Sequence, residues 1–436
     1  MINTSRFEYR KGYITIGIRS IIQILLFMFL FNAIFIPVDT FQLKKIALIF
    51  LWIFSIGCIL KISSKEEKLI LGFGLILTTY TILLSMLQTG DILANIKAGY
   101  VGYILLLYPL LRKYDIDFES MLFQFLKLLA IFMVIMALLD LSGVVPMFSN
   151  PILMWLYNST NAGIGKGAHL PIGYAIFMKA SPMLLLYIPY CFDKKKYVSA
   201  FVGYLALITS GTRANIILGT FMIFFCIIYR EKNWGKRAVL LLLSMALITI
   251  ALIESPIIAY FTDMFDRKAV SDAVRTGTLA SIVEGWKSNP FSFIMGSGYT
   301  SNFYNSGRDA WVTTSELSYW NLLRQVGIVP FGLMMIMYFY PAIKLLKIRR
   351  NLLITVGYLA YMAVAYTNPL LYSSTGLTTL LLMYYLCYRE TNLHRNQINI
   401  KCYGGVQNKG NHFSRRRRHT SVSVDDGNEQ TVTASL

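Results

Sequence analysis

The sequence has few charged residues, few histidines and none of the common catalytic motifs. Only 14% of its 436 residues are Asp, Glu, Lys or Arg, well below the share that covers the surface of a soluble protein, and 56% are hydrophobic. The five scattered cysteines form no CxxC pair and no cluster with histidine, so neither a zinc site nor a disulfide framework is indicated. HExxH, GxSxG and complete Walker motifs are also missing. We therefore expect no metal and no cofactor.

Long apolar runs take the place of the missing charge. Runs such as 21–36, 69–87 and 238–253 match the roughly 30 Å of a bilayer core at 1.5 Å per helical residue. They do not alternate in polarity as the strands of a membrane β-barrel do. The sequence predicts an all-α, polytopic integral membrane bundle of about twelve transmembrane helices, or eleven if the short seventh run does not span. The predicted spans are 14–36, 43–60, 69–87, 94–111, 121–141, 171–190, 197–211, 214–229, 238–254, 317–343, 351–368 and 375–388.

The net charge of +19 follows the orientation rule for membrane proteins and does not suggest nucleic-acid binding. With the N-terminus inside, most lysines and arginines fall in inner segments, which predicts that both termini are cytoplasmic. The exceptions in short outer segments are Lys44, Lys45, Lys97, Lys166 and Arg213.

The part of the protein that is predicted to lie outside the bilayer is concentrated on the outer face, in a large loop over residues 255–316. Loops of this length are usually functional, and short helices such as 279–286 are expected within it. Residues 389–436 form a polar tail with the basic run Arg415–Arg418, predicted to be disordered and cytoplasmic. The chain therefore divides into N-terminal helices (1–204), a membrane region that includes the outer loop (205–388) and the tail.

A few charges occur at membrane depth, where they are costly and usually face a cavity or a partner. Arg213 is near the outer boundary and could hold the diphosphate of a lipid-linked substrate, or simply be a snorkelling arginine that ends a helix. Lys179 and Arg324 lie within predicted spans. Each is either a functional charge inside the membrane or the partner of a buried carboxylate. Asp140 and Glu254 are the candidate carboxylates.

Three motifs occur in a fixed order over about residues 205–335. The first is Ser210-Gly-Thr-Arg213, which opens an apolar run. The second is Arg275 followed by Glu284-Gly-Trp-Lys-Ser-Asn-Pro290 and Ile294-Met-Gly-Ser-Gly298, and the third is a polar cluster that leads into Leu322-Leu-Arg-Gln-Val-Gly-Ile328. In order, spacing and membrane side they resemble the bacterial O-antigen polymerase and ligase superfamily.

The resemblance implies a GT-C-like enzyme of the bacterial cytoplasmic (inner) membrane. Such enzymes transfer oligosaccharide from an undecaprenyl-diphosphate donor to an acceptor at the outer face, without metal or nucleotide. Ligases of the family carry a histidine where this sequence has Leu317 and Ser318. We therefore expect a Wzy-type polymerase that joins repeat units in O-antigen, capsule or exopolysaccharide synthesis. The alternatives are a ligase-type transferase, a flippase or transporter of lipid-linked oligosaccharides, and a non-enzymatic assembly partner.

The same resemblance supplies candidate site residues and partners. Arg213 and Arg275 are expected to bind the diphosphates, with Arg308 as a weaker sugar or phosphate contact. Glu316 is the first candidate for the general base and Asp309 the second, although a carboxylate on a loop is usually only solvated. The expected partners are the lipid-linked donor and acceptor, the bilayer, a co-polymerase that regulates chain length and a flippase.

Overall fold

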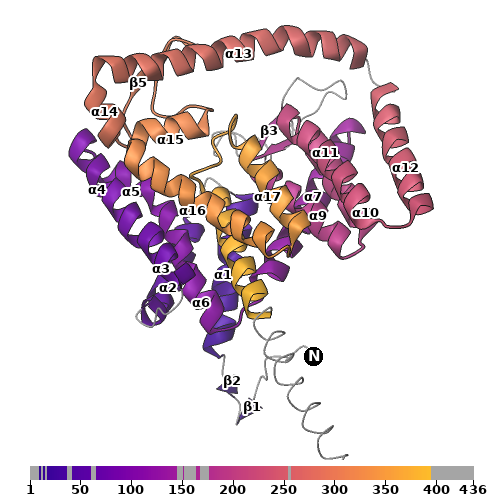
Figure 1. Ribbon diagram of the computed structural model, residues 1–436, viewed down its shortest axis with the longest axis horizontal. Coiled ribbons are helices and arrows are strands. Elements are labelled where there is room, and N and C mark those ends of the chain that lie inside the picture. Colours follow the sequence, from indigo (N-terminus) through magenta and orange to yellow (C-terminus); the bar gives the residue numbers. More distant parts are fainter. Residues whose placement is uncertain are drawn as a thin grey trace, which may run out of the picture. The chain divides into compact units, whose positions relative to one another are not determined.

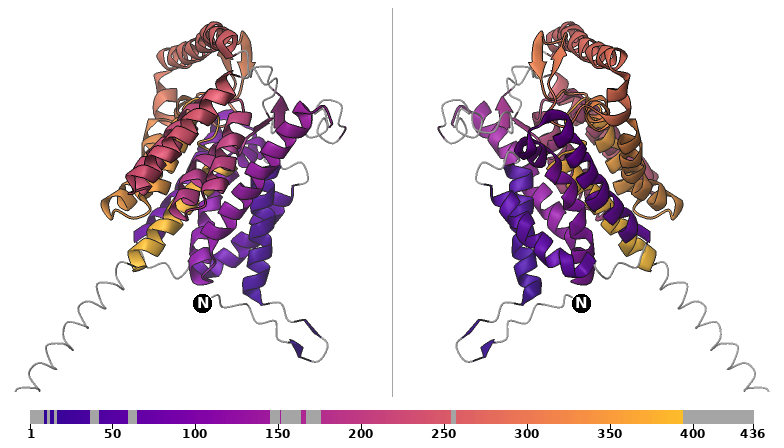
Figure 2. Two further views of the ribbon diagram at one scale, coloured as in Figure 1. Left: turned by 90° about the vertical axis from the view of Figure 1, so that its right-hand side faces the viewer. Right: turned by 90° about the vertical axis from the view of Figure 1, so that its left-hand side faces the viewer.

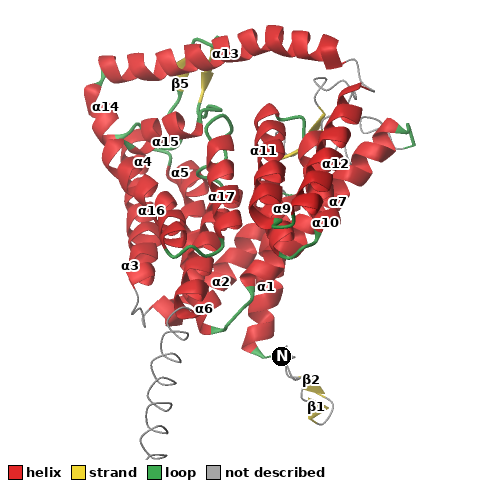
Figure 3. Cartoon of the chain, turned by 45° about the vertical axis from the view of Figure 1, so that its right-hand side comes forward, coloured by secondary structure: helices red, strands yellow, loops and turns green. Residues whose placement is uncertain are grey.

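A computed structural model describes residues 9–10, 13–14, 17–36, 42–59, 65–144, 151, 164–166, 176–253 and 257–393. Helices make up most of these residues (Figure 3). The chain divides into two compact units, Met1–Cys387 and Tyr388–Leu436, and everything below concerns the first. The predicted tail falls in the second unit, where residues 394–436 lie outside the described residues.

Among the residues that the structure describes, six helices are long and apolar enough to cross a membrane, by length and composition. They fall on predicted spans one, three, four, five, eight and ten, and they indicate an all-α membrane protein. Their bounds are Ile18–Phe35, Glu66–Thr89, Ile92–Lys113, Phe118–Asp140, Arg213–Arg230 and Ile328–Lys347.

The first half of the chain consists of long helices with local irregularities (Figure 1). A π-helical segment interrupts the third predicted span, and a 3-10 segment interrupts the fourth. The elements are a short hairpin of β1 (Tyr9–Arg10) and β2 (Tyr13–Ile14), then α1 (Ile18–Phe35), α2 (Leu43–Ile59), α3 (Lys65–Leu71), η1 (Gly72–Leu77), α4 (Thr78–Thr89), α5 (Ile92–Gly99), η2 (Tyr100–Leu107), α6 (Tyr108–Lys113) and α7 (Phe118–Leu141).

The second half carries shorter helices and most of the structure outside the apolar bundle. Its elements are the paired strands β3 (Ile164–Lys166) and β4 (Ile176–Met178), then η3 (Ser181–Met183), α9 (Leu184–Asp193), α10 (Tyr197–Thr209), α11 (Arg213–Arg230), α12 (Trp234–Ile253), α13 (Ile257–Ser288), α14 (Pro290–Met295), the hairpin β5 (Phe303–Asn305) and β6 (Ala310–Val312), α15 (Ser318–Val326), α16 (Ile328–Lys347) and α17 (Leu352–Val364). Residues 374–387 are helical as well.

Apolar side chains on the outside of the helices support the membrane assignment. Phe27 is 54% exposed, Ile53 57% and Ile76 64%, although each lies in the middle of an apolar helix. A contiguous apolar surface of this kind would aggregate in water and is stable against lipid tails. Two buried tyrosines of the interior form a chain of hydrogen bonds: Tyr358 donates to the carbonyl of Tyr338 at 3.0 Å, and Tyr338 donates to that of Leu371 at 2.6 Å.

Two predicted spans differ from the structure. The region of span 171–190 is described from residue 176 onward, and its helix begins only at Leu184, after β4 and η3. Span 317–343 is two helices, α15 and α16, separated at Gly327 with φ +84. A Cβ at Gly327 would lie 2.2 Å from the carbonyl oxygen of Ile294, so this close approach requires glycine.

The predicted large loop is more regular than expected. Short helices were predicted there, but α13 is one continuous helix of 32 residues. It lies across one end of the helical bundle (Figure 1), and in the side views of Figure 2 it is seen nearly end-on above the other helices. The chain then turns through α14 and the β5–β6 hairpin toward α15. This end of the bundle carries the candidate site.

Candidate functional site

Three of the predicted site residues lie close together, with one carboxylate within ion-pair distance of two guanidinium groups. They come from α13, the turn of the β5–β6 hairpin and the loop before α15. Glu316 Oε1 lies 2.5 Å from Arg308 Nη2, and Glu316 Oε2 lies 4.0 Å from Arg275 Nη2. Arg275 also lies 3.4 Å from Asp272 Oδ1. We call Arg275, Arg308 and Glu316 the arginine–glutamate cluster. All three side chains are partly exposed, and ion pairs of this kind contribute only about 0–1 kcal/mol each, so the cluster is not required to hold the fold together.

A contact between two glycines explains how the cluster forms. A Cβ on Gly277 would lie 2.6 Å from Cα of Gly307, so α13 and the β5–β6 hairpin touch backbone to backbone. Thr278 Oγ1 donates to Asn305 Oδ1 at 2.9 Å beside this contact. Arg275 lies two residues before Gly277 in α13, and Arg308 follows Gly307, so the glycine contact holds together the two segments that carry these arginines.

Asp309, the second candidate base, has a local structural role. It occupies the turn of the hairpin with φ +50, a conformation that Asp tolerates better than most residues. The hydroxyl of Tyr304 donates to Asp309 Oδ1, and this hydrogen bond raises the pKa of the tyrosine. The carboxylate of Asp309 therefore contacts Tyr304 and not the arginine–glutamate cluster.

Arg213 stands apart from the cluster, at the first position of α11. The preceding turn needs Gly211, which has φ +66. The buried amide of Asn215 fixes the turn by donating to Ser210 Oγ at 3.1 Å and to Ser181 Oγ at 3.3 Å. Among the described residues, no ion pair joins Arg213 to Glu316.

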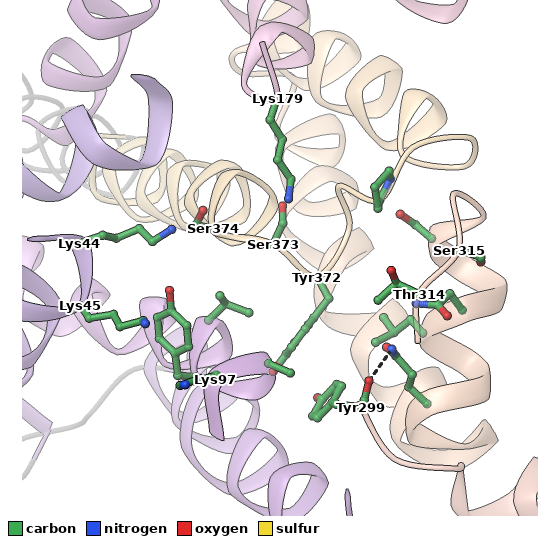
Figure 4. Close-up of a pocket in the computed structure, with 18 residues that line it drawn as sticks. Lys44, Lys45, Lys97, Lys179, Tyr299, Thr314, Ser315, Tyr372, Ser373 and Ser374 are labelled. Atoms are coloured by element: carbon green, nitrogen blue, oxygen red, sulfur yellow. Dashed lines mark hydrogen bonds between the residues drawn. The ribbon is translucent and has the colours of Figure 1, made fainter. Parts of the chain in front are cut away.

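A cavity of about 560 Å³ is lined by four lysines and by Thr314 and Ser315, which precede Glu316 in the chain. In Figure 4, Lys44 and Lys45 from the first turn of α2 point into it from the left, and Lys179 points down toward Ser373 from the top. None of the described lining residues is acidic. We call this cavity the lysine pocket; its lysines are Lys44, Lys45, Lys97 and Lys179.

The wall of the lysine pocket is rigid and polar. Tyr299 and Tyr372 stack with ring centroids 5.4 Å apart. Gln325 donates to the carbonyl of Tyr299 at 3.0 Å (dashed in Figure 4), and the Tyr372 hydroxyl donates to the carbonyl of Gly99 at 2.9 Å. Ser315 is only 7% exposed, and its hydroxyl has no hydrogen-bond partner among the described residues. A buried donor without a partner is unfavourable unless a ligand satisfies it.

The electrostatics of the lysine pocket favour an anion. Burial lowers the pKa of Lys179, because an ammonium group is poorly solvated there. Lys44 is buried in the first turn of α2, where the helix dipole also disfavours a cation. An anionic ligand would favour the protonated form of Lys179. No group of three or more His, Cys, Asp or Glu that could hold a metal ion occurs in the part of the chain that the structure describes.

One loop connects the lysine pocket to the arginine–glutamate cluster. Thr314 and Ser315 line the pocket, and the next residue is Glu316. Arg324 anchors this loop by donating to the carbonyl of Thr313 at 2.8 Å, and its guanidinium carbon lies 4.3 Å from the centre of the Phe303 ring. The pocket and the cluster are therefore connected by consecutive residues of one loop, Ser315 and Glu316.

Neither Arg324 nor Lys179 lies in one of the six candidate membrane-spanning helices of the described residues. Arg324 is in α15, where burial lowers its pKa to about 10, and its described partners are carbonyls, Ser301 and Asn321 rather than a carboxylate. Lys179 follows β4 in a turn. The candidate partner Glu254 lies outside the described residues.

The lysine pocket was missed in the sequence, although a signal was present. Lys44, Lys45 and Lys97 are exceptions to the charge rule that sets membrane orientation, and Lys179 was a charge at predicted membrane depth. Their convergence could not be predicted, since they belong to α2, α5 and the turn after β4.

Comparisons with protein-family models, with curated proteins and with solved structures give no match to this chain. The function is therefore argued from the chemistry of the two neighbouring groups of residues.

Proposed function

We propose that the protein is a polysaccharide polymerase that joins oligosaccharide repeat units carried on undecaprenyl diphosphate. The observation that carries the proposal is the lysine pocket, which has four ammonium groups and no described carboxylate, next to Glu316. The resemblance of the three motifs to O-antigen polymerases supplies the substrate class.

A sugar diphosphate fits the lysine pocket by charge and by chemistry. Each phosphate is negative and accepts several hydrogen bonds, which lysine ammonium groups and serine hydroxyls donate. When the sugar is transferred, the diphosphate leaves with additional negative charge. Fixed ammonium groups stabilise that charge more in a partly enclosed pocket than in water, and this difference lowers the barrier.

The transfer itself requires a proton acceptor near the leaving group. A hydroxyl oxygen of the acceptor sugar forms a bond to the anomeric carbon of the donor, and the bond from that carbon to the diphosphate oxygen breaks. The hydroxyl proton passes to Glu316. Arg308 holds Oε1 of Glu316 at 2.5 Å, whereas Oε2 lies 4.0 Å from Arg275, so Oε2 is the oxygen available to accept the proton.

The other predicted residues keep supporting roles in the proposal. Arg275 and Arg308 orient Glu316 and face the substrate's sugars or phosphates. Arg213 is retained as a second diphosphate contact, because the turn that carries it is hydrogen-bonded to Ser181, two residues beyond Lys179. Asp309 remains the second candidate base.

In this proposal the protein lies in the bacterial inner membrane. It crosses the membrane with about twelve spans in a GT-C-like arrangement, and both termini are cytoplasmic. The lysine pocket would then open toward the outer leaflet. A flippase would deliver the lipid-linked units, and a co-polymerase would set the chain length.

Deletion of the gene in its host, followed by gel analysis of the surface polysaccharide, tests the proposal. We expect single repeat units on the surface in place of long chains, restored by the wild-type gene and by a Lys347→Gln control but not by Lys179→Gln or Glu316→Gln. Full-length chains left on the lipid carrier would instead assign a ligase. Undisplayed single units at the inner face would assign a flippase, and an unchanged pattern would refute the polysaccharide function.

A further inference from the structure

A second basic cavity lies between the α9–α10 turn and the α11–α12 turn. Its volume is about 820 Å³. Four cationic side chains line it, together with apolar side chains at the start of α12. The cations are Lys195, Arg230, Lys232 and Lys236, and the apolar residues include Val239 and Leu240.

This cavity lies at the edge of the apolar part of the bundle. Helix α11 has 18 residues and is a candidate membrane span, so at 1.5 Å per residue it crosses roughly 27 Å and ends at Arg230. Exposed Tyr229 and Trp234 flank this end, and Trp234 is 75% exposed. Aromatic residues of this kind are enriched where lipid headgroups meet the hydrocarbon core.

The positive charge of the cavity is largely uncompensated. Its described acidic lining residue is Glu231, which accepts a hydrogen bond from the backbone N–H of Asn233 at 3.2 Å. Arg230 lies 3.8 Å from Asp193, at the limit of an ion pair. Within the described residues, Lys232 and Lys236 make no ion pair. The cavity thus presents ammonium groups without described ion-pair partners at the depth where the phosphates of lipid headgroups lie.

The turn between α11 and α12 is held in shape by contacts that do not use these lysines. The guanidinium of Arg237 donates to the carbonyl of Glu231 at 2.7 and 3.0 Å, and it lies 5.5 Å from the ring of Trp234. Membrane orientation depends on the number of positive charges in a loop and does not require them to converge on one cavity. The convergence therefore calls for a ligand.

We propose that this cavity binds the phosphate headgroup of an anionic phospholipid. The cationic side chains face the phosphate, and the acyl chains run along Val239 and the exposed apolar side chains Leu242 and Leu243 of α12. The combination of cations with an adjoining lipid-facing apolar surface fits a lipid better than a soluble phosphate. This site is separate from the lysine pocket and does not depend on the polymerase function.

Lipid retention by the full chain tests the site. The protein is purified in detergent with defined phosphatidylglycerol, cardiolipin or phosphatidylcholine, and bound lipids are counted by native mass spectrometry. The triple variant Arg230→Gln, Lys232→Gln, Lys236→Gln should weaken anionic lipid binding on the order of a hundredfold and leave phosphatidylcholine unchanged. The control triple Lys347→Gln, Arg349→Gln, Arg350→Gln removes the same charge at the C-terminal end of α16 and just after it, and should retain the lipid.

Three outcomes would overturn the inference. An equal loss of anionic lipid binding in both triple variants would show a diffuse effect of charge. Binding of phosphatidylcholine as tight as that of the anionic lipids would show that the site does not select the headgroup. Displacement of the lipid by millimolar inorganic phosphate would assign the cavity to a soluble anion. If the triple variant does not fold, the exposed single variant Lys232→Gln replaces it, with an expected loss of roughly fivefold.

Discussion

Replacement of Gly307 by alanine should open the hairpin that carries Arg308. The added Cβ would lie 2.1 Å from the carbonyl oxygen of Val274 and 2.8 Å from its carbonyl carbon. Both neighbours are backbone atoms of α13 and cannot rotate away. The hairpin must therefore move from the helix by roughly 1 Å, since this overlap cannot be relieved by a side chain.

The size of the effect follows from the hydrogen bonds at this contact. The hydroxyls of Ser281 and Ser306 are 2.9 Å apart, and Ser306 Oγ donates to the carbonyl of Gly277 at 3.0 Å. A movement of roughly 1 Å breaks both, at about 1 kcal/mol each. Local opening of residues 303–312 should become roughly 30-fold more populated.

Hydrogen–deuterium exchange of the purified protein measures this opening directly. We expect faster exchange of the hairpin amides in Gly307→Ala, unchanged exchange in α9 and α10, and loss of polymer formation because Arg308 leaves Glu316. Gly285→Ala is the matched control on the same helix, since a Cβ there meets nothing within 4 Å. Unchanged hairpin exchange in Gly307→Ala would refute the reasoning about the glycine contact.

Three further predictions concern the two groups of site residues. Lys179→Gln should weaken the binding of pyrophosphate, measured by calorimetry, at least about tenfold through loss of a charged donor, and an unchanged affinity would remove Lys179 from the site. Because burial lowers the pKa of Lys179 and anion binding needs the protonated amine, pyrophosphate affinity should fall as pH rises through that lowered pKa. The Lys179→Arg variant should keep its pyrophosphate affinity to a higher pH than the wild type. Identical affinity–pH profiles of the two proteins would contradict this. Glu316→Gln should reduce the rate of sugar transfer by roughly 100- to 10,000-fold with pyrophosphate affinity within about twofold. A rate close to wild type would exclude Glu316 as the base.

The long apolar helices could be predicted from the sequence because they depend on a local property. A run of apolar residues long enough to cross a bilayer must satisfy its own backbone hydrogen bonds, and a helix does so without any distant partner. The helices Ile18–Phe35 and Phe118–Asp140 therefore lie close to their predicted bounds. The number of spans in the whole protein stays a prediction.

Other features of the fold depend on contacts between distant residues, and these could not be predicted. The break between α15 and α16 at Gly327 depends on the close approach of the backbone of Ile294. The hydropathy averaged over 317–343 does not reveal this break, because the average includes both the polar α15 and the apolar α16. The long α13 was missed because its polar sequence has no strong apolar period, although its backbone forms an unbroken helix.

The candidate site could be predicted only in part. The sequence pointed to Arg275 and Glu316 through motifs and to Arg308 as a charge of the large loop, and the structure brings these three together. The sequence gave no geometry, because the placement of the two arginines depends on the contact between Gly277 and Gly307. The other two candidates, Arg213 and Asp309, lie outside the cluster.

The lysine pocket suggests how exceptions to the charge rule can be interpreted. Positive charge on the outer side of a membrane protein opposes the bias that orients it, so such residues persist where another interaction favours them. Lys44 and Lys45 also oppose the dipole of α2. Three of the five exceptions in predicted outer segments, Lys44, Lys45 and Lys97, line one cavity with Lys179. The convergence of these four ammonium groups on a cavity with no acidic residue among its described lining residues is the observation that favours an anion there.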